Sequence, residues 1–200
     1  HTSPKVQVLQ VWPGLHEDGI FGLAIDLGST TVAAHLTDLQ TGAVVASSGV
    51  MNPQIRFGED LMSRVSYAMM NSDGDQEMTA AVREAINALA DDLAKQLGCS
   101  TDQLLEVVFV CNPVMHHLLL GIDPVELGQA PFALATSDSL SLKAADLDLT
   151  ALNPAARCYI LPCIAGHVGA EAAAVAWWDE AAASEALVLI VGVGARAAGR

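Results

Sequence analysis

The stretch GLAIDLGSTTVAAHLTDLQTGAVVASS, residues 22–48, decides the fold of this chain. Three apolar runs lie in it or just before it, at residues 20–25, 32–36 and 44–46, and short polar turns separate them. Turns that carry Gly, Ser or Asp between β-type apolar runs are typical of antiparallel hairpins. We therefore expect three antiparallel strands at the start of the domain.

The first of these turns follows a single acid. Asp26 closes the first apolar run, and Gly28, Ser29, Thr30 and Thr31 come after it. A carboxylate at the end of a buried strand is unfavourable unless a partner satisfies it. A turn of Gly, Ser and Thr offers backbone N–H groups and hydroxyls that bind phosphate, and a nearby carboxylate holds hydrated Mg²⁺. The residues therefore predict a phosphate-and-magnesium hairpin, although an ordinary hairpin with a polar turn fits them equally well.

The composition of the chain restricts the classes of partner that the protein can bind. The chain has 200 residues, is 52% hydrophobic and 4% aromatic, and carries a formal net charge of −14. Such acidity disfavours nucleic acid and anionic membrane surfaces, because both repel a negative protein. The sequence shows neither an apolar stretch of membrane-spanning length nor a signal-peptide pattern, and its scattered cysteines contain no CxxC pair. We therefore expect a cytoplasmic protein with reduced, buried thiols.

The rest of the sequence alternates between helical and strand patterns. Apolar residues at helical spacing predict helices over residues 61–69, 78–97, 114–120 and 168–183. Continuous apolar runs predict strands at residues 104–110, 159–161 and 187–191. Residues 130–156 show no sustained pattern, so we expect irregular, extended structure there. This order predicts an α/β fold with a mixed sheet, in which αβαβα follows the three antiparallel strands.

Four blocks of sequence, residues 21–42, 52–69, 107–124 and 161–174, carry a resemblance to a known family. The segment AIDLGSTT resembles the first phosphate motif of the actin-like (ribonuclease H-like) ATPase superfamily. Together, the four blocks resemble the reductive activators of corrinoid proteins, which join an iron–sulfur domain and a linker to a two-lobed actin-like ATPase domain. The resemblance implies a linker at residues 1–19, a first ATPase lobe at 20–185 and the truncated start of a second lobe at 186–200.

The resemblance assigns roles to the first turn. Asp26 is the expected catalytic acid on the metal side. The expected partners of the β- and γ-phosphates of ATP are the four turn residues Gly28, Ser29, Thr30 and Thr31. The implied cofactors are therefore ATP and Mg²⁺.

Later blocks add further candidates. Gly166 and Gly169 match the segment that joins the two lobes, and Glu171 is the expected residue that orients the attacking water. A solvated acid in the first turn of a helix fits Glu171 equally well. Asn112 and His116 match a family block whose chemistry the residues do not reveal. His116 is followed by a second histidine that points elsewhere on a helix, so packing with a side-chain hydrogen bond is the favoured interpretation.

The sequence departs from the superfamily after the lobe connection. A second phosphate motif, a strand ending in Asp followed by Gly-Thr, is expected there. Gly192 stands where the acid belongs and Ala195 where the hydroxyl belongs. The chain therefore holds about half of a nucleotide cleft, and we expect the isolated chain to be inactive.

The resemblance implies a function for the parent protein. It is expected to return an oxidised corrinoid protein to the Co(I) state, coupling ATP binding or hydrolysis to electron transfer from an iron–sulfur cluster outside this chain. A corrinoid protein or a corrinoid-dependent methyltransferase is the expected partner, and the family suggests a homodimer. Two alternatives stay open: another actin-like ATPase, such as a dehydratase activator or small-molecule kinase, and a non-catalytic interaction module with a degenerate half cleft.

Overall fold

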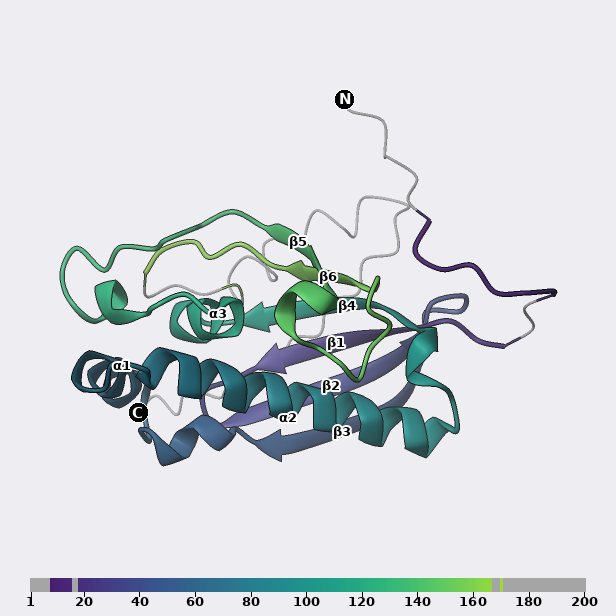
Figure 1. The fold of residues 1–200 in the computed structure, drawn as a ribbon, viewed down its shortest axis with the longest axis horizontal. Helices are drawn as coiled ribbons and strands as arrows, with labels where there is room; N and C mark the ends of the chain where they lie inside the picture. The colour runs from purple at the N-terminus through teal and green to yellow at the C-terminus, as the bar shows by residue number, and fades with distance from the viewer. Residues whose placement is uncertain (1–7, 16–17, 167–169, 171–200) are drawn as a thin grey trace, which may run out of the picture.

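A central mixed sheet organises the computed structural model, which describes residues 8–15, 18–166 and 170. The sheet has six strands in the order β3-β2-β1-β4-β6-β5. The longest helix, α2, runs along the face of the sheet formed by β1, β2 and β3, with α1 beside one of its ends (Figure 1). None of the helices in the described ranges is long and apolar enough to cross a membrane.

The strands confirm the predicted meander and the mixed pairing. Their bounds are β1 Phe21–Leu27, β2 Thr31–Asp38, β3 Val44–Met51, β4 Leu104–Cys111, β5 Leu140–Lys143 and β6 Arg157–Ile160. The first three pair antiparallel in sequence order. Strand β4 pairs parallel with both β1 and β6, whereas β5 pairs antiparallel with β6. Strands β1, β4 and β6 therefore end at the same edge of the sheet.

The helices begin and end close to the predicted residues. Their bounds are α1 Leu61–Met70, α2 Gly74–Leu97 and α3 Pro113–Leu120, and short 3₁₀ turns lie at Pro53–Arg56, Thr101–Gln103, Val125–Gly128 and Ala144–Leu147. Both α2 and α3 end at a glycine in the left-handed region, Gly98 with φ +75° and Gly121 with φ +73°. That conformation is the usual helix stop, which is why the glycines predicted these ends correctly.

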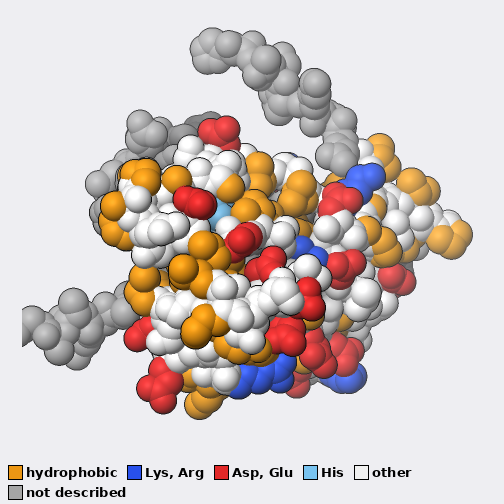
Figure 2. All heavy atoms as spheres, turned by 60° about the vertical axis from the view of Figure 1, so that its left-hand side comes forward, with side chains coloured by type: hydrophobic (Ala, Val, Ile, Leu, Met, Phe, Trp, Pro, Cys, Tyr) orange, Lys and Arg blue, Asp and Glu red, His pale blue; other side chains and the backbone are white. Residues whose placement is uncertain are grey.

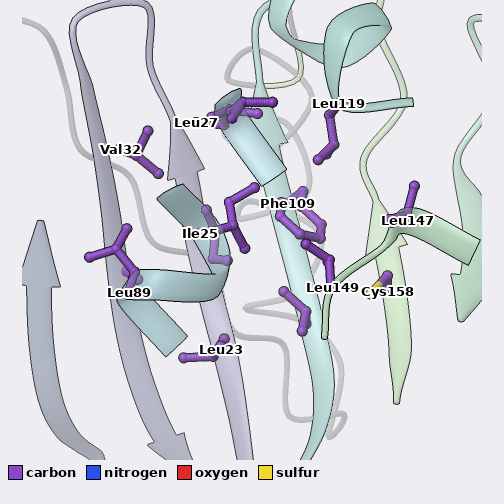
Figure 3. Close-up of a cluster of buried hydrophobic side chains, with 14 of the residues drawn as sticks. Leu23, Ile25, Leu27, Val32, Leu89, Phe109, Leu119, Leu147, Leu149 and Cys158 are labelled. Carbon is purple, nitrogen blue, oxygen red and sulfur yellow. The ribbon is translucent and has the colours of Figure 1, made fainter. Parts of the chain in front are cut away.

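The core lies between the sheet and α2. Alternate side chains of β1, Leu23, Ile25 and Leu27, point toward the helix layer, where Leu89 of α2 meets them (Figure 3). Phe109 of β4 extends the same cluster across the sheet. A smaller group lies on the opposite face of β4 and β6, formed by Leu161, Ala170, Val108, Val110 and Tyr159. Both faces of the central strands are therefore covered, as expected for parallel strands.

The structure corrects two expectations. Residues 130–156 include a strand, β5, which the sequence did not predict because its pattern is only four residues long and it depends on pairing with β6. On α1, Met69 is 60% exposed although the helical spacing placed it on the apolar face, and Arg64 is fully buried beside Val65. The guanidinium of Arg64 donates hydrogen bonds to main-chain carbonyls inside the protein. Met69 has no group that could donate such bonds.

Several predicted elements lie outside the described residues: the helix over 168–183, the strand over 187–191, and the residues Gly192 and Ala195. The described part of the predicted linker, residues 8–15 and 18–19, contains no helix or strand. The division into linker, first lobe and second lobe stays a prediction.

Candidate functional site

The polar segments of interest gather at one edge of the sheet. Strands β1, β4 and β6 are parallel, so the turn after Leu27, the segment after Cys111 and the segment after Ile160 leave the sheet on the same side. Strand β3 ends there too, because Thr31 at the start of β2 pairs with Met51 at the end of β3. Ligands of open α/β sheets bind at the carboxyl ends of such strands. This edge is therefore the candidate site.

Asp26 lies on the sheet face opposite to the main core. Its neighbours Ile25 and Leu27 point into the core, so the alternation of the strand directs the Asp26 side chain to the other face. In register it stands between Ala33 of β2 and Val110 of β4, and it is half-buried. The acid is thus one residue from the last core position of β1 and two from the turn.

The turn after β1 is tight. The Gly28 amide donates to the Thr31 carbonyl oxygen at 3.0 Å. A Cβ atom on Gly28 would lie 2.7 Å from that same oxygen, closer than real Cβ atoms approach backbone. Only glycine therefore fits the first position of the turn without opening it.

Three successive carbonyl groups of the turn point into the protein. The Gly28 oxygen accepts from Asn52 Nδ2 at 2.8 Å, and the Thr30 oxygen accepts from the Asn52 amide at 2.8 Å. Between them, the Ser29 oxygen accepts from Arg64 Nη2 at 2.5 Å. Two residues from outside the hairpin therefore fix the orientation of this main chain: Asn52 after β3, through its side chain and its backbone N–H, and Arg64 in α1, through its side chain.

Inward carbonyls leave the amides pointing outward. In a trans peptide the C=O and the following N–H point in opposite directions, so the N–H groups of Ser29 and Thr30 face away from Asn52 and Arg64. Neither amide donates to another group in the described part of the chain. Adjacent outward N–H groups form an anion-binding concavity. The Ser29 and Thr30 amides therefore point away from the protein's hydrogen-bond network, and their role in binding phosphate stays a prediction.

A buried polar network supports the turn from behind. Asn52, Gln54 and Arg64 are all fully buried. Asn52 Oδ1 accepts from the Gln54 amide at 2.9 Å, and Gln54 Nε2 donates to the Met78 carbonyl of α2 at 2.9 Å. Sequence reasoning missed these three residues as site components. The available signal was an arginine adjacent to the apolar stripe of α1, in the same block that carries the family resemblance.

The segment after β4 is held by its own side chains. Asn112 caps α3 by accepting from the Met115 amide at 3.0 Å. His117 Nδ1 bonds to the Pro113 carbonyl at 2.8 Å, and its Nε2 accepts from the Ala135 amide at 3.1 Å. Burial lowers the pKa of His117, which suits this neutral donor–acceptor role. The histidine thus ties α3 to the loop that follows it.

His116 is packed without a hydrogen bond. Its side chain is fully buried, and neither ring nitrogen has a partner among the residues that the structure describes. Burial lowers the pKa of His116 to about 4, and the adjacent His117 adds to the shift. The two rings tilt against each other with centroids 5.5 Å apart. The expected packing role is confirmed for His116, and the expected side-chain hydrogen bond belongs to His117 instead.

Gly166 lies in the segment that follows β6 and meets the loop after α3. A Cβ atom there would lie 2.0 Å from the Phe132 carbonyl oxygen, so a side chain would displace that backbone. Gly169 and Glu171 lie outside the described residues. The structure therefore places Asp26 and the turn at Gly28–Thr31 at one edge of the sheet and Gly166 against Phe132, and the roles of all these residues stay predictions.

The donor set fits a nucleotide phosphate with its own Mg²⁺ better than a resident metal. No cluster of three or more His, Cys, Asp or Glu side chains suited to a metal ion occurs within the described ranges. One carboxylate beside an array of amides matches a magnesium ion that keeps its waters and arrives with phosphate. The four cysteines are thiols, and burial together with Asp146 raises the pKa of Cys158 to about 12. Such a thiol is a core residue.

Acidic side chains are more common than basic ones on the surface. On the face shown in Figure 2, Asp and Glu side chains outnumber Lys and Arg, in line with the net charge of −14. A polyphosphate is repelled by such a surface, so its binding depends on local donors and on a cation. The outward amides of the turn are donors of that kind.

Comparisons with known proteins identify the family of the chain. The family model described as the RACo middle region matches residues 21–181. The chain is 33% identical over 159 residues to the corrinoid activation enzyme RamQ of Eubacterium limosum, covering 80% of this chain and 27% of that protein. A solved structure of a reductive activator for a corrinoid, iron–sulfur protein has a TM-score of 0.79 and 34% identity, over 86% of this chain and 27% of that one.

The shared architecture confirms the predicted fold class, a lobe of the actin-like ATPase type with a mixed sheet. The chain spans 27% of the length of each of these two relatives. The family model covers most of the chain, and it includes the phosphate turn, Asn52, Arg64 and Gly166. The chain belongs to the family of the RACo middle region.

Proposed function

We propose that this chain is the phosphate-binding first lobe of an ATP-dependent activator that returns an oxidised corrinoid protein to its reduced state. The observation that carries the proposal is the turn at Gly28–Thr31, whose carbonyls are held inward so that its amides face outward beside Asp26. The names of the two relatives, both activators of corrinoid proteins, support the corrinoid part.

In this proposal the chain acts by positioning. The amides of Ser29 and Thr30 bind the β- and γ-phosphates, and the Asp26 carboxylate orients the waters of the accompanying Mg²⁺. Magnesium, when bound with the nucleotide, neutralises phosphate charge that an acidic protein would otherwise repel. The lobe contributes electrostatic stabilisation and orientation to phosphoryl transfer, and no covalent step involves its residues.

The remaining predicted residues complete the proposal. Gly166 and Gly169 belong to the connection between the lobes, and Glu171 orients the water that attacks the γ-phosphate. Residues 186–200 begin a second lobe, which closes on the nucleotide in the whole protein. Closure then lets an electron from an iron–sulfur cluster elsewhere in that protein reach the cobalt of the corrinoid partner, which is reduced to Co(I). The dimeric state and the cytoplasmic location belong to the same proposal.

Calorimetric titration of MgATP tests the phosphate site, using a protein of the relatives' full length that contains this chain. We expect Asp26→Asn to weaken binding at least about tenfold, the loss of one charge-assisted contact. Asp73→Asn is the matched control, because Asp73 precedes α2, is exposed and makes no capping hydrogen bond. If the unaltered protein binds no nucleotide, the proposal fails and the non-catalytic interaction module becomes the better interpretation.

A further inference from the structure

Arg64 is a buried cation without an acidic partner. It is the largest fully buried side chain of the described residues. Its guanidinium donates to the carbonyls of Gly58 and Ser29, at 2.9 and 2.5 Å, and weakly to Gln54 Oε1 and Met115 Sδ, each at 3.5 Å. Every one of these acceptors is neutral. A buried charge is normally paired, so the arrangement is unfavourable unless an anion completes it.

The described residues supply no such anion. Among the residues that the structure describes, no carboxylate comes within salt-bridge distance of Arg64. Burial lowers the pKa of Arg64 and the exposed Asp60 opposes that shift, but the guanidinium remains protonated because its ordinary pKa is so high. Within the described part of the chain, the positive charge directly behind the turn therefore has no ion-pair partner.

One peptide group separates this charge from the candidate site. The guanidinium donates to the Ser29 carbonyl, and the Thr30 N–H of the same peptide points away on the other side. A cation on the carbonyl polarises the peptide and makes its N–H a stronger donor. An anion bound to the Thr30 amide would thus interact favourably with Arg64 without touching it.

We propose that Arg64 is a positioning residue for phosphate: through the Ser29–Thr30 peptide it aims the turn amides outward, and a phosphate bound there is its missing counter-charge. The inference rests on the proposed nucleotide function and adds a residue and a mechanism to it. Asn52 supports the same orientation, because it donates hydrogen bonds to the carbonyls of Gly28 and Thr30 on either side of Ser29.

Substitution of Arg64 separates its effect on binding from its effect on folding. In the full-length protein, we expect Arg64→Lys to keep the charge but to lose the planar fork, and to weaken MgATP about tenfold. Hydrogen exchange of the Gly28 and Asn52 amides, which donate to the Thr31 and Thr30 carbonyls, should accelerate without nucleotide. Arg83→Lys is the matched control, because Arg83 also donates to a buried carbonyl, that of Leu119, but lies on α2 away from the turn. It should leave MgATP affinity unchanged.

A second pair of variants tests the charge alone. Met115 Sδ lies 3.5 Å from both Arg64 Nη1 and Asn52 Nδ2, so Met115→Glu gives Arg64 an internal counter-ion, and Met115→Gln places a neutral group of the same shape there. We expect both variants to hold the turn, as judged by hydrogen exchange. MgATP should bind about tenfold more weakly to Met115→Glu than to Met115→Gln, because the Arg64 charge is already compensated.

The outcomes separate this inference from the proposed function. If the unaltered protein binds MgATP and both Met115 variants bind it equally, Arg64 is only a structural link and the inference is wrong, while the proposed function stands. The same holds if Arg64→Lys has the free energy of unfolding of the unaltered protein and binds MgATP with unchanged affinity. If the unaltered protein does not bind MgATP, both fall together.

Discussion

Gly28→Ala is the perturbation that most directly tests the geometry of the turn. The added Cβ would lie 2.7 Å from the Thr31 carbonyl oxygen, which belongs to the backbone and cannot rotate away. The turn has to open by several tenths of an ångström, stretching the 3.0 Å bond from the Gly28 amide to Thr31. Overpacking of this kind costs about 1–3 kcal/mol. Opening also shifts the Ser29 and Thr30 amides, so MgATP affinity should fall about tenfold.

Urea unfolding and calorimetric titration measure the two effects of this variant. Gly49→Ala is the matched control, because a Cβ on Gly49 of β3 meets its nearest atom, the Val32 carbonyl oxygen, at an ordinary 3.5 Å. We expect Gly49→Ala to change the free energy of unfolding by less than about 0.5 kcal/mol. If Gly28→Ala is as stable as Gly49→Ala and binds nucleotide normally, the turn is not as tight as the structure indicates, and the reasoning is refuted.

Two further predictions concern buried groups outside the turn. The pKa of His116 is about 4 in the folded chain against an ordinary 6.5, so the unfolded chain binds the extra proton between these pH values. The contribution of neutral His116 to the free energy of unfolding should therefore be fully present above pH 6.5. It should fall by up to about 3 kcal/mol as the pH drops toward 4. Urea unfolding at several pH values should show a weaker dependence of the unfolding free energy on pH in His116→Leu than in the unaltered protein. An identical dependence in both proteins would assign the loss of stability to other groups. Cys158, which is buried and has a pKa of about 12, should resist a thiol reagent at pH 8 in the folded chain, whereas the half-buried Cys99 should react first. Mass spectrometry of the labelled peptides checks the order, and early labelling of Cys158 would contradict the packing of β6.

The elements that local patterns specify were predicted well. The β1–β3 meander follows from apolar runs separated by polar turns, and α2 follows from a stripe of buried residues that includes Met78, Val82 and Ile86. Helix ends at Gly98 and Gly121 follow from the left-handed conformation that glycine adopts easily. All of these signals act within a few residues of the chain, so a single sequence contains them.

The elements missed depend on contacts between distant parts of the chain. Strand β5 is four residues long and exists through its pairing with β6. The burial of Arg64 depends on the carbonyl of Ser29, 35 residues earlier, and no helical pattern encodes that acceptor. For the candidate site, the residues of the turn and the family resemblance predict phosphate binding at Gly28–Thr31, and this stays a prediction. The outward direction of the turn amides depends on Asn52 and Arg64, which come from distant parts of the chain and were not predicted.

The amides of Ser29 and Thr30 face outward, and we propose that they bind the phosphates of ATP. Amide hydrogen exchange of the full-length protein, resolved by NMR or by fragmentation mass spectrometry, tests this claim with and without MgATP. We expect both amides to exchange rapidly without nucleotide and to become protected when MgATP binds, while amides of the β2–β3 turn near Gly42 stay unchanged. Binding of MgATP without protection of Ser29 and Thr30 would place the phosphates elsewhere and contradict the account.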